Sequence, residues 1–341
     1  MRHASRYAWL LLLLAGCWQQ RPVAELGQGY TPNPDGTKLF LQELDEPLFR
    51  DAGRDALDGA KGVDTFLYRA MLRAHQARYG SPWKVGNQGA VGSCVGWGFS
   101  QAAYCSLSVA WTQDEIPDPP LLTSPESCYA GSRVEARGKP EGGGGYSDGS
   151  YGGAAARWLN KWGVVFRDRV LDHDLTQYSE ARCKEWGRWG NGGEGDNGKL
   201  DAYAKRHPVH HVALVRTFDE AAAAIESGYP VAVCSGVGYT RTRDALGYCR
   251  ASGTWNHCMY AAGVRWQKNG SPEDALLIIN SWGDYVDGGK WPDDQPDGSF
   301  WARRADIELM LSKWEDSFAV GAVQGFKYRD LSHREWLDNA R

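Results

Sequence analysis

One cysteine of this chain stands where covalent chemistry is favoured. Cys94 ends a polar, glycine-rich stretch (86–93) and precedes an apolar, small-residue stretch (95–110) that predicts a buried helix. At the N-terminus of such a helix, unpaired backbone N–H groups and the positive end of the helix dipole favour a thiolate over a thiol. Because the thiolate is the nucleophilic form, Cys94 is a candidate nucleophile. A single cysteine is more often part of the core, so the hypothesis needs a base and an orienting group.

Both groups occur in the last third of the chain. His257 enters an apolar run, and Asn280 and Trp282 follow the hydrophobic strand expected over 275–279. In the catalytic interpretation, His257 takes the proton of Cys94 to form a thiolate–imidazolium pair and then protonates the leaving amine. Asn280 accepts a hydrogen bond from the other ring nitrogen, and Trp282 shields that bond from water. The alternative for His257 is a core histidine bonded to a backbone carbonyl.

The motifs around these residues resemble those of the papain-like cysteine peptidases. The similar stretches, within residues 81–326, are Asn87-Gln88-Gly89, Gly92-Ser93-Cys94, Asn256-His257, Asn280-Ser281-Trp282-Gly283 and Asp297-Gly298-Ser299-Phe300-Trp301. The resemblance implies that Gln88, six residues before Cys94, holds the oxyanion together with the Cys94 backbone N–H. Two positions depart from the family pattern: Val91 replaces a frequent disulfide cysteine, and Val95 replaces the usual tryptophan. Neither change removes a catalytic group.

The same resemblance implies a fold and a set of substrate-binding residues. The expected fold class is α+β, the papain-like two-lobe fold, in which a helical lobe with the nucleophile helix packs against an antiparallel β-rich lobe across an active-site cleft. Gly149 and Ser150, in a glycine-rich turn before a helix, are expected to pair with the substrate main chain. Cys234, or its neighbour Ser235, is expected near the wall of the main specificity pocket. Asn256, next to the histidine, completes this set.

The chain divides into an N-terminal export region and a folded domain. Residues 1–16 have a basic start, a short apolar core and small residues, which is typical of a secretory signal peptide. The ending Leu14-Ala15-Gly16-Cys17 resembles a bacterial lipobox, so Cys17 is expected to be lipidated and to anchor the protein to the membrane of the cell envelope; a plain cleaved signal is the alternative. If the cell has two membranes, Trp18 favours the outer one.

The remaining segments are predicted from composition and periodicity. Residues 17–63 are polar and predict a weakly structured tether, and 64–80 predict an N-terminal helix capped by Asp64, with a reduced prosegment as the alternative. The peptidase domain is expected over 81–330, with an insertion rich in Gly, Asn and Asp at 186–198, and a C-terminal tail over 331–341.

Composition and charge limit the other classes of function. With 341 residues, 42% hydrophobic residues and a net charge of −4, the chain is expected to fold and gives no basis for nucleic-acid binding. His207, His210 and His211 lack acidic or cysteine ligands at zinc-site spacing, so no metal or other cofactor is expected, and the protein is expected to be a monomer. Export permits disulfides between the six other cysteines, with Cys128–Cys183 and Cys234–Cys249 as guesses and Cys258 as a buried thiol.

The function predicted from these residues is hydrolysis of peptide bonds in a peptide or protein substrate through a thioester acyl-enzyme. Two alternatives remain open at this point. One is a cell-wall amidase or endopeptidase with the same Cys/His chemistry, which an envelope location favours. The other is a non-catalytic binding module on a peptidase fold, which the retention of Gln88, Cys94 and His257 disfavours.

Overall fold

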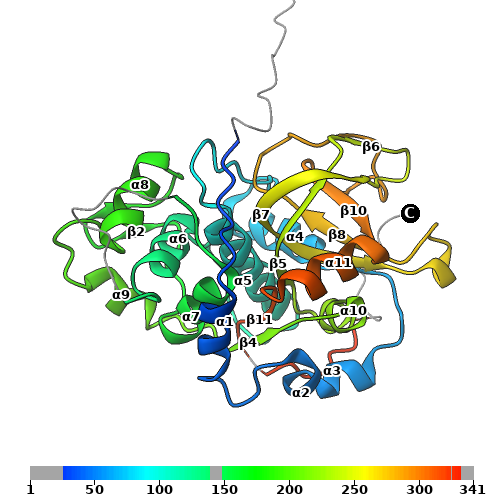
Figure 1. The fold of residues 1–341 in the computed structure, drawn as a ribbon, viewed down its shortest axis with the longest axis horizontal. Helices are drawn as coiled ribbons and strands as arrows, with labels where there is room; N and C mark the ends of the chain where they lie inside the picture. Colours follow the sequence, from blue (N-terminus) through cyan, green and yellow to red (C-terminus); the bar gives the residue numbers. More distant parts are fainter. Residues whose placement is uncertain (1–25, 139–147, 324, 332–341) are drawn as a thin grey trace, which may run out of the picture.

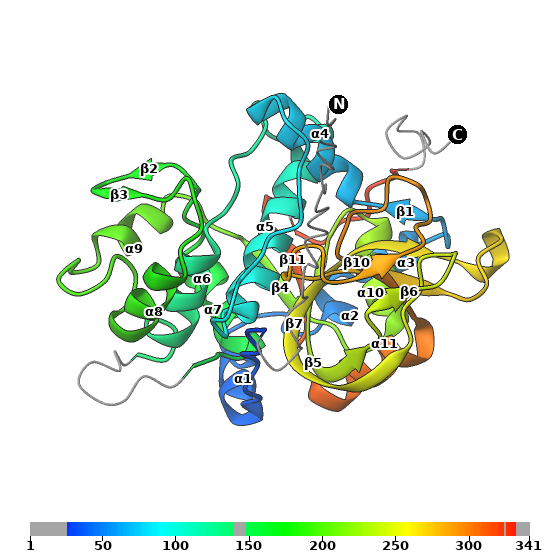
Figure 2. The same cartoon turned by 90° about the horizontal axis from the view of Figure 1, so that it is seen from above.

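A computed structural model describes residues 26–138, 148–323 and 325–331. In this part of the chain a helical half and a sheet-containing half lie on either side of one long helix, α5 (Cys94–Thr112) (Figures 1 and 2). The predicted leader with Cys17, and positions 332–341 of the predicted tail, lie outside the described residues. No helix among the described residues is long and apolar enough to cross a membrane.

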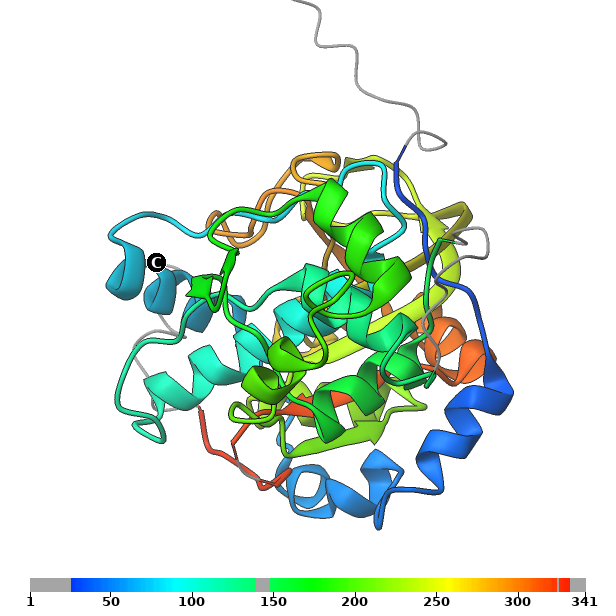
Figure 3. The same cartoon turned by 90° about the vertical axis from the view of Figure 1, so that its left-hand side faces the viewer.

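The helical half, which faces the viewer in Figure 3, is built from short elements that pack around α5. Its first helix begins at Pro125 because Ser124 caps it: the Ser124 Oγ accepts a hydrogen bond from the Ser127 N–H at 3.2 Å. The elements of this half are α6 (Pro125–Arg133), α7 (Gly152–Lys161), β2 (Arg169–Val170), β3 (His173–Asp174), α8 (Glu180–Trp189) and α9 (Lys199–Ala204).

The other half contains a seven-stranded sheet whose paired strands are antiparallel, in the order β10-β8-β7-β5-β11-β4, with β1 also paired to β7. The strands are β1 (Thr65–Phe66), β4 (His211–Leu214), β5 (Val231–Tyr239), β7 (Ala251–Arg265), β8 (Ala275–Ile279), β10 (Ser299–Arg303) and β11 (Phe318–Gly321). The accompanying elements are α10 (Phe218–Glu226), β6 (Thr242–Arg243), η2 (Gln267–Asn269), β9 (Asp287–Gly288) and α11 (Arg304–Trp314). Because β7 and β8 are neighbouring strands, His257 in β7 and Asn280, directly after β8, lie close to each other.

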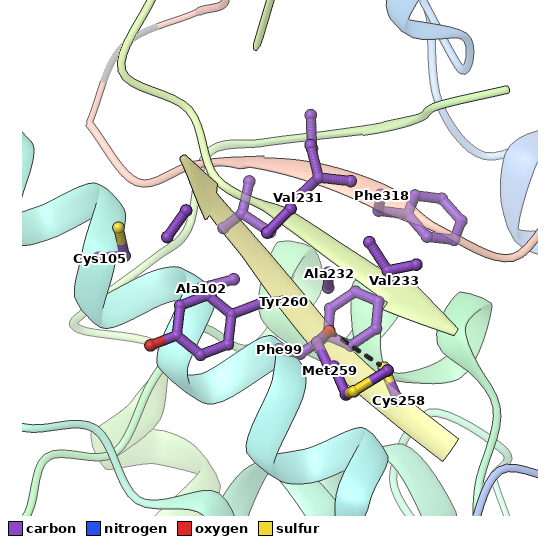
Figure 4. Packing of buried hydrophobic residues seen from close by; sticks show 14 of the residues in the cluster. Phe99, Ala102, Cys105, Val231, Ala232, Val233, Cys258, Met259, Tyr260 and Phe318 are labelled. Atoms are coloured by element: carbon purple, nitrogen blue, oxygen red, sulfur yellow. Dashed lines mark hydrogen bonds between the residues drawn. The ribbon is translucent and has the colours of Figure 1, made fainter. Parts of the chain in front are cut away.

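The shared core fixes α5 against the sheet (Figure 4). Phe99 of α5 lies 6.1 Å, between ring centroids, from Phe318 of β11, and both are fully buried together with Met259 of β7. Burying each such side chain contributes about 1.5–3 kcal/mol. This packing sets the position of Cys94, at one end of α5, relative to the strand that carries His257.

The segment predicted as a weakly structured tether is folded from residue 26 onward, which corrects that prediction. It contains α1 (Pro34–Leu41), α2 (Phe49–Ala52) and α3 (Arg54–Gly59). The cause is the packing of two aromatic side chains on the core. The ring centroids of Phe40 and Phe318 are 6.1 Å apart, and those of Phe49 and Phe326 are 5.1 Å apart. The helix predicted over 64–80 is present as α4 (Tyr68–Tyr79). It begins later because Asp64 accepts a hydrogen bond from the Trp266 N–H at 2.9 Å instead of capping a helix.

The seven described cysteines are free, so the pairings Cys128–Cys183 and Cys234–Cys249 are wrong. Cys234 lies opposite Cys258 in the β5–β7 ladder, and the Cys183 thiol donates a hydrogen bond to the Tyr178 hydroxyl at 3.4 Å. Cys258 is fully buried.

Asp316 joins the N-terminal helix to the rest of the fold. Its buried carboxylate accepts hydrogen bonds from the Thr37 hydroxyl of α1 and from the backbone N–H groups of Gly152 and Gly153 at the start of α7, each at 2.7 Å. The carboxylate therefore caps α7 and holds α1 beside it.

We expect Asp316→Ala to lower the free energy of unfolding by about 3 kcal/mol, because three buried donors lose their acceptor at once. Urea denaturation followed by circular dichroism measures the loss. Asp293→Ala is the matched control, since Asp293 is exposed, and should change the free energy by no more than about 0.5 kcal/mol. Equal denaturation midpoints for the two variants would contradict the capping role.

Candidate active site

The loop that follows β8 holds three of the four predicted catalytic side chains: its own Asn280, and His257 and Gln88, which form hydrogen bonds to it. His257 Nε2 and Asn280 Oδ1 are 2.7 Å apart, and both residues are buried. The Asn280 oxygen also accepts from the Ser281 N–H at 2.6 Å, which fixes the amide orientation. Ser281 in turn donates its hydroxyl to Gln88 Oε1 at 2.6 Å, and its carbonyl accepts from the Gln88 N–H at 2.8 Å. Sequence reasoning missed this role of Ser281, although it lies inside the Asn-Ser-Trp-Gly motif.

Trp282 covers the histidine as predicted from its place beside Asn280. Its ring is stacked on the His257 ring with centroids 4.1 Å apart and planes 27° apart, and Trp255 packs on Trp282 at 4.9 Å. Trp282 is buried. An apolar cover of this kind keeps water from competing for the His257–Asn280 hydrogen bond.

Cys94 is the first residue of α5, as the sequence predicts, and it is fully buried. The loop before it is held down by side chains of the helical half: the Ser93 hydroxyl is 3.0 Å from the Tyr178 hydroxyl, and the Gly92 N–H donates to Asp148 Oδ2 at 2.7 Å. Tyr178 and Asp148 are further supporting residues that the local motifs do not reveal, because they lie far away in the sequence.

A segment of the chain itself, residues 26–31, lies across these residues. In Figure 1 it runs in dark blue between the two halves and leads into α1. Its backbone is fixed at several points: Gly27 N–H to Gly89 O at 3.0 Å, Tyr30 N–H to Asn256 O at 3.1 Å, Ser150 N–H to Gly29 O at 2.7 Å, and Thr31 N–H to Ser150 O at 2.8 Å. Tyr30 and Ser150 form a parallel β-bridge.

This covering segment occupies groups that the sequence analysis assigns to substrate. The Gln88 amide, predicted to hold an oxyanion, donates instead to Gly27 O at 2.7 Å and to Val91 O at 2.8 Å. Ser150 and Asn256, predicted to bind substrate, pair with the backbone of residues 29–31. The Gly149 carbonyl accepts from Arg133 Nη1. The structure thus brings the predicted residues together around one extended peptide, which is the chain's own.

The side chain of Tyr30 fills the space beside the fourth predicted substrate-binding residue, Cys234. The phenol is buried, and burial raises the pKa of Tyr30, with nearby Asp316 and Cys234 raising that pKa further. Its hydroxyl makes no hydrogen bond of normal geometry. The Tyr30 ring is therefore buried within the site, with the Asp316 carboxylate near its hydroxyl.

Two glycines allow the covering segment to lie this close. A Cβ atom on Gly27 would collide with the Val91 carbonyl, and a Cβ atom on Gly29 would collide with the Gly92 backbone. Only glycine, which has no Cβ atom, fits where two backbone segments approach this closely. The pattern Gly27-Gln28-Gly29 was the available signal in the sequence, but it does not by itself indicate what the segment approaches.

Comparison with solved structures identifies the architecture. Xylellain, a cysteine protease from Xylella fastidiosa, matches with a TM-score of 0.56 at 17% identity, over 88% of this chain and 97% of that one. The fold is papain-like. Procathepsin L 3 from the larval midgut of Tenebrio molitor (TM-score 0.47, 15% identity, 87% and 83% coverage) and bromelain from Ananas comosus (0.39, 16%, 71% and 94%) are also similar. No family model matches the sequence, and no curated protein matches it. The predicted fold class is confirmed.

In this papain-like fold burial disfavours the charged forms of the candidate nucleophile and of the candidate base. Burial raises the pKa of Cys94, nearby Cys258 raises it further, and the backbones of Cys258 and Gly29 lower it in part. Burial lowers the pKa of His257 to about 4, although the hydrogen bond to Asn280 opposes this shift. His257 Nδ1 is buried and makes no hydrogen bond. Water does not reach either group to stabilise its charged form, and at Cys94 the Gly29 backbone of the covering segment is one of the groups that exclude it.

If His257 acts as the predicted base for peptide hydrolysis, Asn280→Ala, tested in a variant with residues 26–31 displaced, lowers kcat/KM by about 10- to 100-fold, because the imidazole loses the group that fixes its orientation. The hydrogen bond to Asn280 raises the pKa of His257, so its loss should also move the alkaline limb of the pH–rate profile to lower pH. Steady-state kinetics from pH 4 to 9 test both effects. An unshifted alkaline limb would show that Asn280 does not act through the imidazole.

Proposed function

We propose that this chain is a cysteine peptidase that folds in a covered, inactive form. The observation that carries the proposal is the His257–Asn280 hydrogen bond of 2.7 Å beneath the Trp282 ring, together with a cysteine at the start of a buried helix whose thiol lies near Cys258, the chain neighbour of His257. A cysteine, a histidine and an amide arranged in this way are suited to nucleophilic acyl transfer. The papain-like fold is consistent with this activity.

The proposed reaction uses only groups of this site. Once the segment leaves, His257 takes the proton of Cys94, and the thiolate attacks the carbonyl carbon of the scissile peptide bond. The resulting oxyanion accepts hydrogen bonds from the Gln88 amide, which the covering segment releases, and from the Cys94 backbone N–H. The imidazolium then protonates the leaving amine, which gives a thioester. Water, deprotonated by His257, hydrolyses the thioester and restores the thiol.

The covering segment supports an activation step before any turnover. Residues 27–31 hold the Gln88 amide, Ser150 and Asn256, and the Gly29 backbone lies against the Cys94 thiol. A substrate cannot bind in the same place, so we propose that displacement or cleavage of this segment starts activity. Anchoring through a lipid on Cys17 remains part of the proposal and rests on the Leu-Ala-Gly-Cys sequence alone.

The test is covalent labelling with a peptidyl epoxide, read by peptide mass spectrometry, alongside turnover of a fluorogenic peptide library under reducing conditions. The protein tested is Gly29→Val, in which the site is expected to be uncovered. The expected result is label on Cys94 only, with turnover lost in proportion to the label, and neither label nor turnover when Cys94→Ala is added. Cys258→Ala, made in the same Gly29→Val background, is the matched control, since it removes a buried thiol near the site, and it should still be labelled. Digestion of purified peptidoglycan without peptide turnover would favour a cell-wall enzyme. If the folded Gly29→Val variant, in which the site is expected to be uncovered, neither turns over substrate nor takes label, the chain is a binding module.

A further inference from the structure

A cavity that the proposed reaction does not use lies beside α4 and α5, which are neighbours in Figure 2. Its volume is about 430 Å³, which is within the range of small-molecule sites. None of the groups that the covering segment holds, Gln88, Ser150 and Asn256, lines it. Its lining includes Trp83, Lys84, Trp97, Gln101, Leu122 and Arg167.

The charges that line this cavity have one sign. Lys84 and Arg167 are cations, and no Asp or Glu among the described residues lines the cavity. The whole chain, by contrast, has a net charge of −4. His75 also lines the cavity, and its Nδ1 atom lies 2.7 Å from the Ser81 carbonyl oxygen. The lining therefore favours an anion over a cation or a metal ion.

The Arg167 guanidinium has no carboxylate partner among the described residues. Its Nη2 atom is buried without an acceptor, and its Cζ atom lies over the Trp97 ring, 5.4 Å from the ring centroid. Burial lowers the pKa of Arg167, and Glu126 opposes this shift. Glu126 Oε1 is already bound, because it accepts from the Ser179 N–H and from Arg182 Nη1, each at 3.0 Å. An anion in the cavity would compensate a buried charge that the chain leaves unpaired.

Gln101 is a second polar group of the lining without a partner. It is only 6% exposed, and its side-chain amide makes no hydrogen bond to any other part of the described chain. Trp97 lies one helical turn earlier on α5, so the two side chains share a face of the helix. The Trp97 ring lies so close to Gly86 that a Cβ atom there would collide with it, and Trp83 adds a second buried ring to the lining. The cavity thus combines cations, one amide and two aromatic rings.

We propose that this cavity binds a small aromatic anion, a carboxylate or a phosphate, with its charged group on Arg167 and Lys84 and its ring against the two tryptophans. Arginine presents paired N–H donors that match two oxygens of a carboxylate or of a phosphate. The Gln101 amide supplies a further donor for an oxygen of the same group. This inference does not depend on the proposed peptidase activity, because it concerns binding by other residues.

The test is the melting temperature of the purified chain in the presence of benzoate, phenyl phosphate or benzamide. With a dissociation constant of about 10⁻⁴–10⁻³ M, about 10 mM of a bound anion should raise the melting temperature by about 2–6 °C. Benzamide, the neutral analogue of benzoate, and sodium chloride should each raise it by less than about 1 °C at the same concentration. A shift with only one of the two anions identifies the charged group that the cavity prefers. Equal shifts with benzoate and benzamide, or no shift with either anion, would overturn the proposal.

Two variants with the same change of charge locate the binding site. Titration calorimetry with the preferred anion should show that Arg167→Gln binds at least about tenfold more weakly than the parent, because it loses charged hydrogen bonds. Arg169→Gln, at a side chain that is 83% exposed, should bind within about twofold of the parent. Gln101→Leu removes the amide and keeps the size of the side chain, so it should bind about threefold more weakly, and it decides the question if Arg167→Gln fails to fold. Equal affinities of Arg167→Gln and Arg169→Gln would place the anion elsewhere, and so would parent-like binding by Gln101→Leu.

Discussion

Replacing Gly29 by valine is expected to raise kcat/KM for peptide substrates about 10²-fold. A side chain at this position meets the Gly92 backbone, which cannot move without disturbing the loop that carries Cys94. Overpacking of this kind costs up to about 3 kcal/mol, and the cost falls on the covered form alone. A shift of that size changes the ratio of covered to uncovered molecules about 10²-fold. The measurement is initial turnover of a fluorogenic peptide, with the rate of Cys94 alkylation at pH 7 as a second readout.

The alkylation rate should rise in the same variant, and the sign follows from the burial of the thiol. Covering raises the pKa of Cys94, so the covered protein should react slowly at neutral pH and faster as the pH rises. Uncovering returns water to the site and lowers that pKa, which increases the thiolate fraction at pH 7. The matched control is Gln28→Ala, at the partly exposed neighbouring position, which should leave both rates close to those of the parent. If Gly29→Val reacts and turns over no faster than Gln28→Ala, the segment does not limit activity.

The site residues could be predicted from the sequence because each one stands in a local pattern. Cys94 is readable from the boundary between a polar loop and an apolar helix, and Asn280 from its place directly after a hydrophobic strand. The contact between His257 and Asn280 follows from strand order, because β7, which carries His257, pairs with β8, which Asn280 follows. Local patterns and strand order are therefore sufficient to predict the contact between His257 and Asn280 and the place of Cys94 at the start of α5.

The covering segment could not be predicted in this way, because its structure depends on contacts with distant parts of the chain. Residues 26–31 have no periodicity of their own, and their backbone is paired with Ser150, Asn256 and Gly89. The polar composition of residues 17–63 favours a tether. The segment folds instead because Phe40 and Phe49 pack on aromatic rings near the C-terminal end of the described chain. Disulfide guesses failed for the same reason, since spacing does not show that Cys234 faces Cys258 across two strands.

Covering acts on the site in two ways that reinforce each other. It occupies the groups that would bind a substrate, because Gly27 O takes the Gln88 amide and residues 29–31 pair with Ser150 and Asn256. It also removes the charges that the reaction needs, because burial favours the neutral thiol of Cys94 and the neutral imidazole of His257. A peptide substrate cannot enter while residues 27–31 hold Gln88, Ser150 and Asn256, so the proposed activation requires the segment to leave.

His257→Ala, made in the Gly29→Val background, is expected to lower kcat/KM about 10³- to 10⁴-fold. The variant lacks both the base that forms the thiolate and the acid that protonates the leaving amine, and general acid–base groups contribute rates of this order. The ring is stacked on Trp282 and bonded to Asn280, so its loss leaves the Asn280 oxygen with only the Ser281 N–H. Turnover of the same fluorogenic peptide measures the loss, and His211→Ala, on the distant edge strand β4, is the matched control and should retain activity.

The pH dependence of Cys94 alkylation distinguishes loss of the base from general damage to the site. With His257 present and uncovered, the thiolate is stabilised by the imidazolium, so alkylation should remain fast down to about pH 5. Without the imidazole, the thiol should titrate near its ordinary pKa of about 8.5, and alkylation should be slow at pH 6 and recover at pH 9. Recovery at high pH shows that the thiol is still accessible and the fold intact. If the variant is alkylated equally fast at pH 6 and pH 9, His257 is not the partner of Cys94, and another group must lower its pKa.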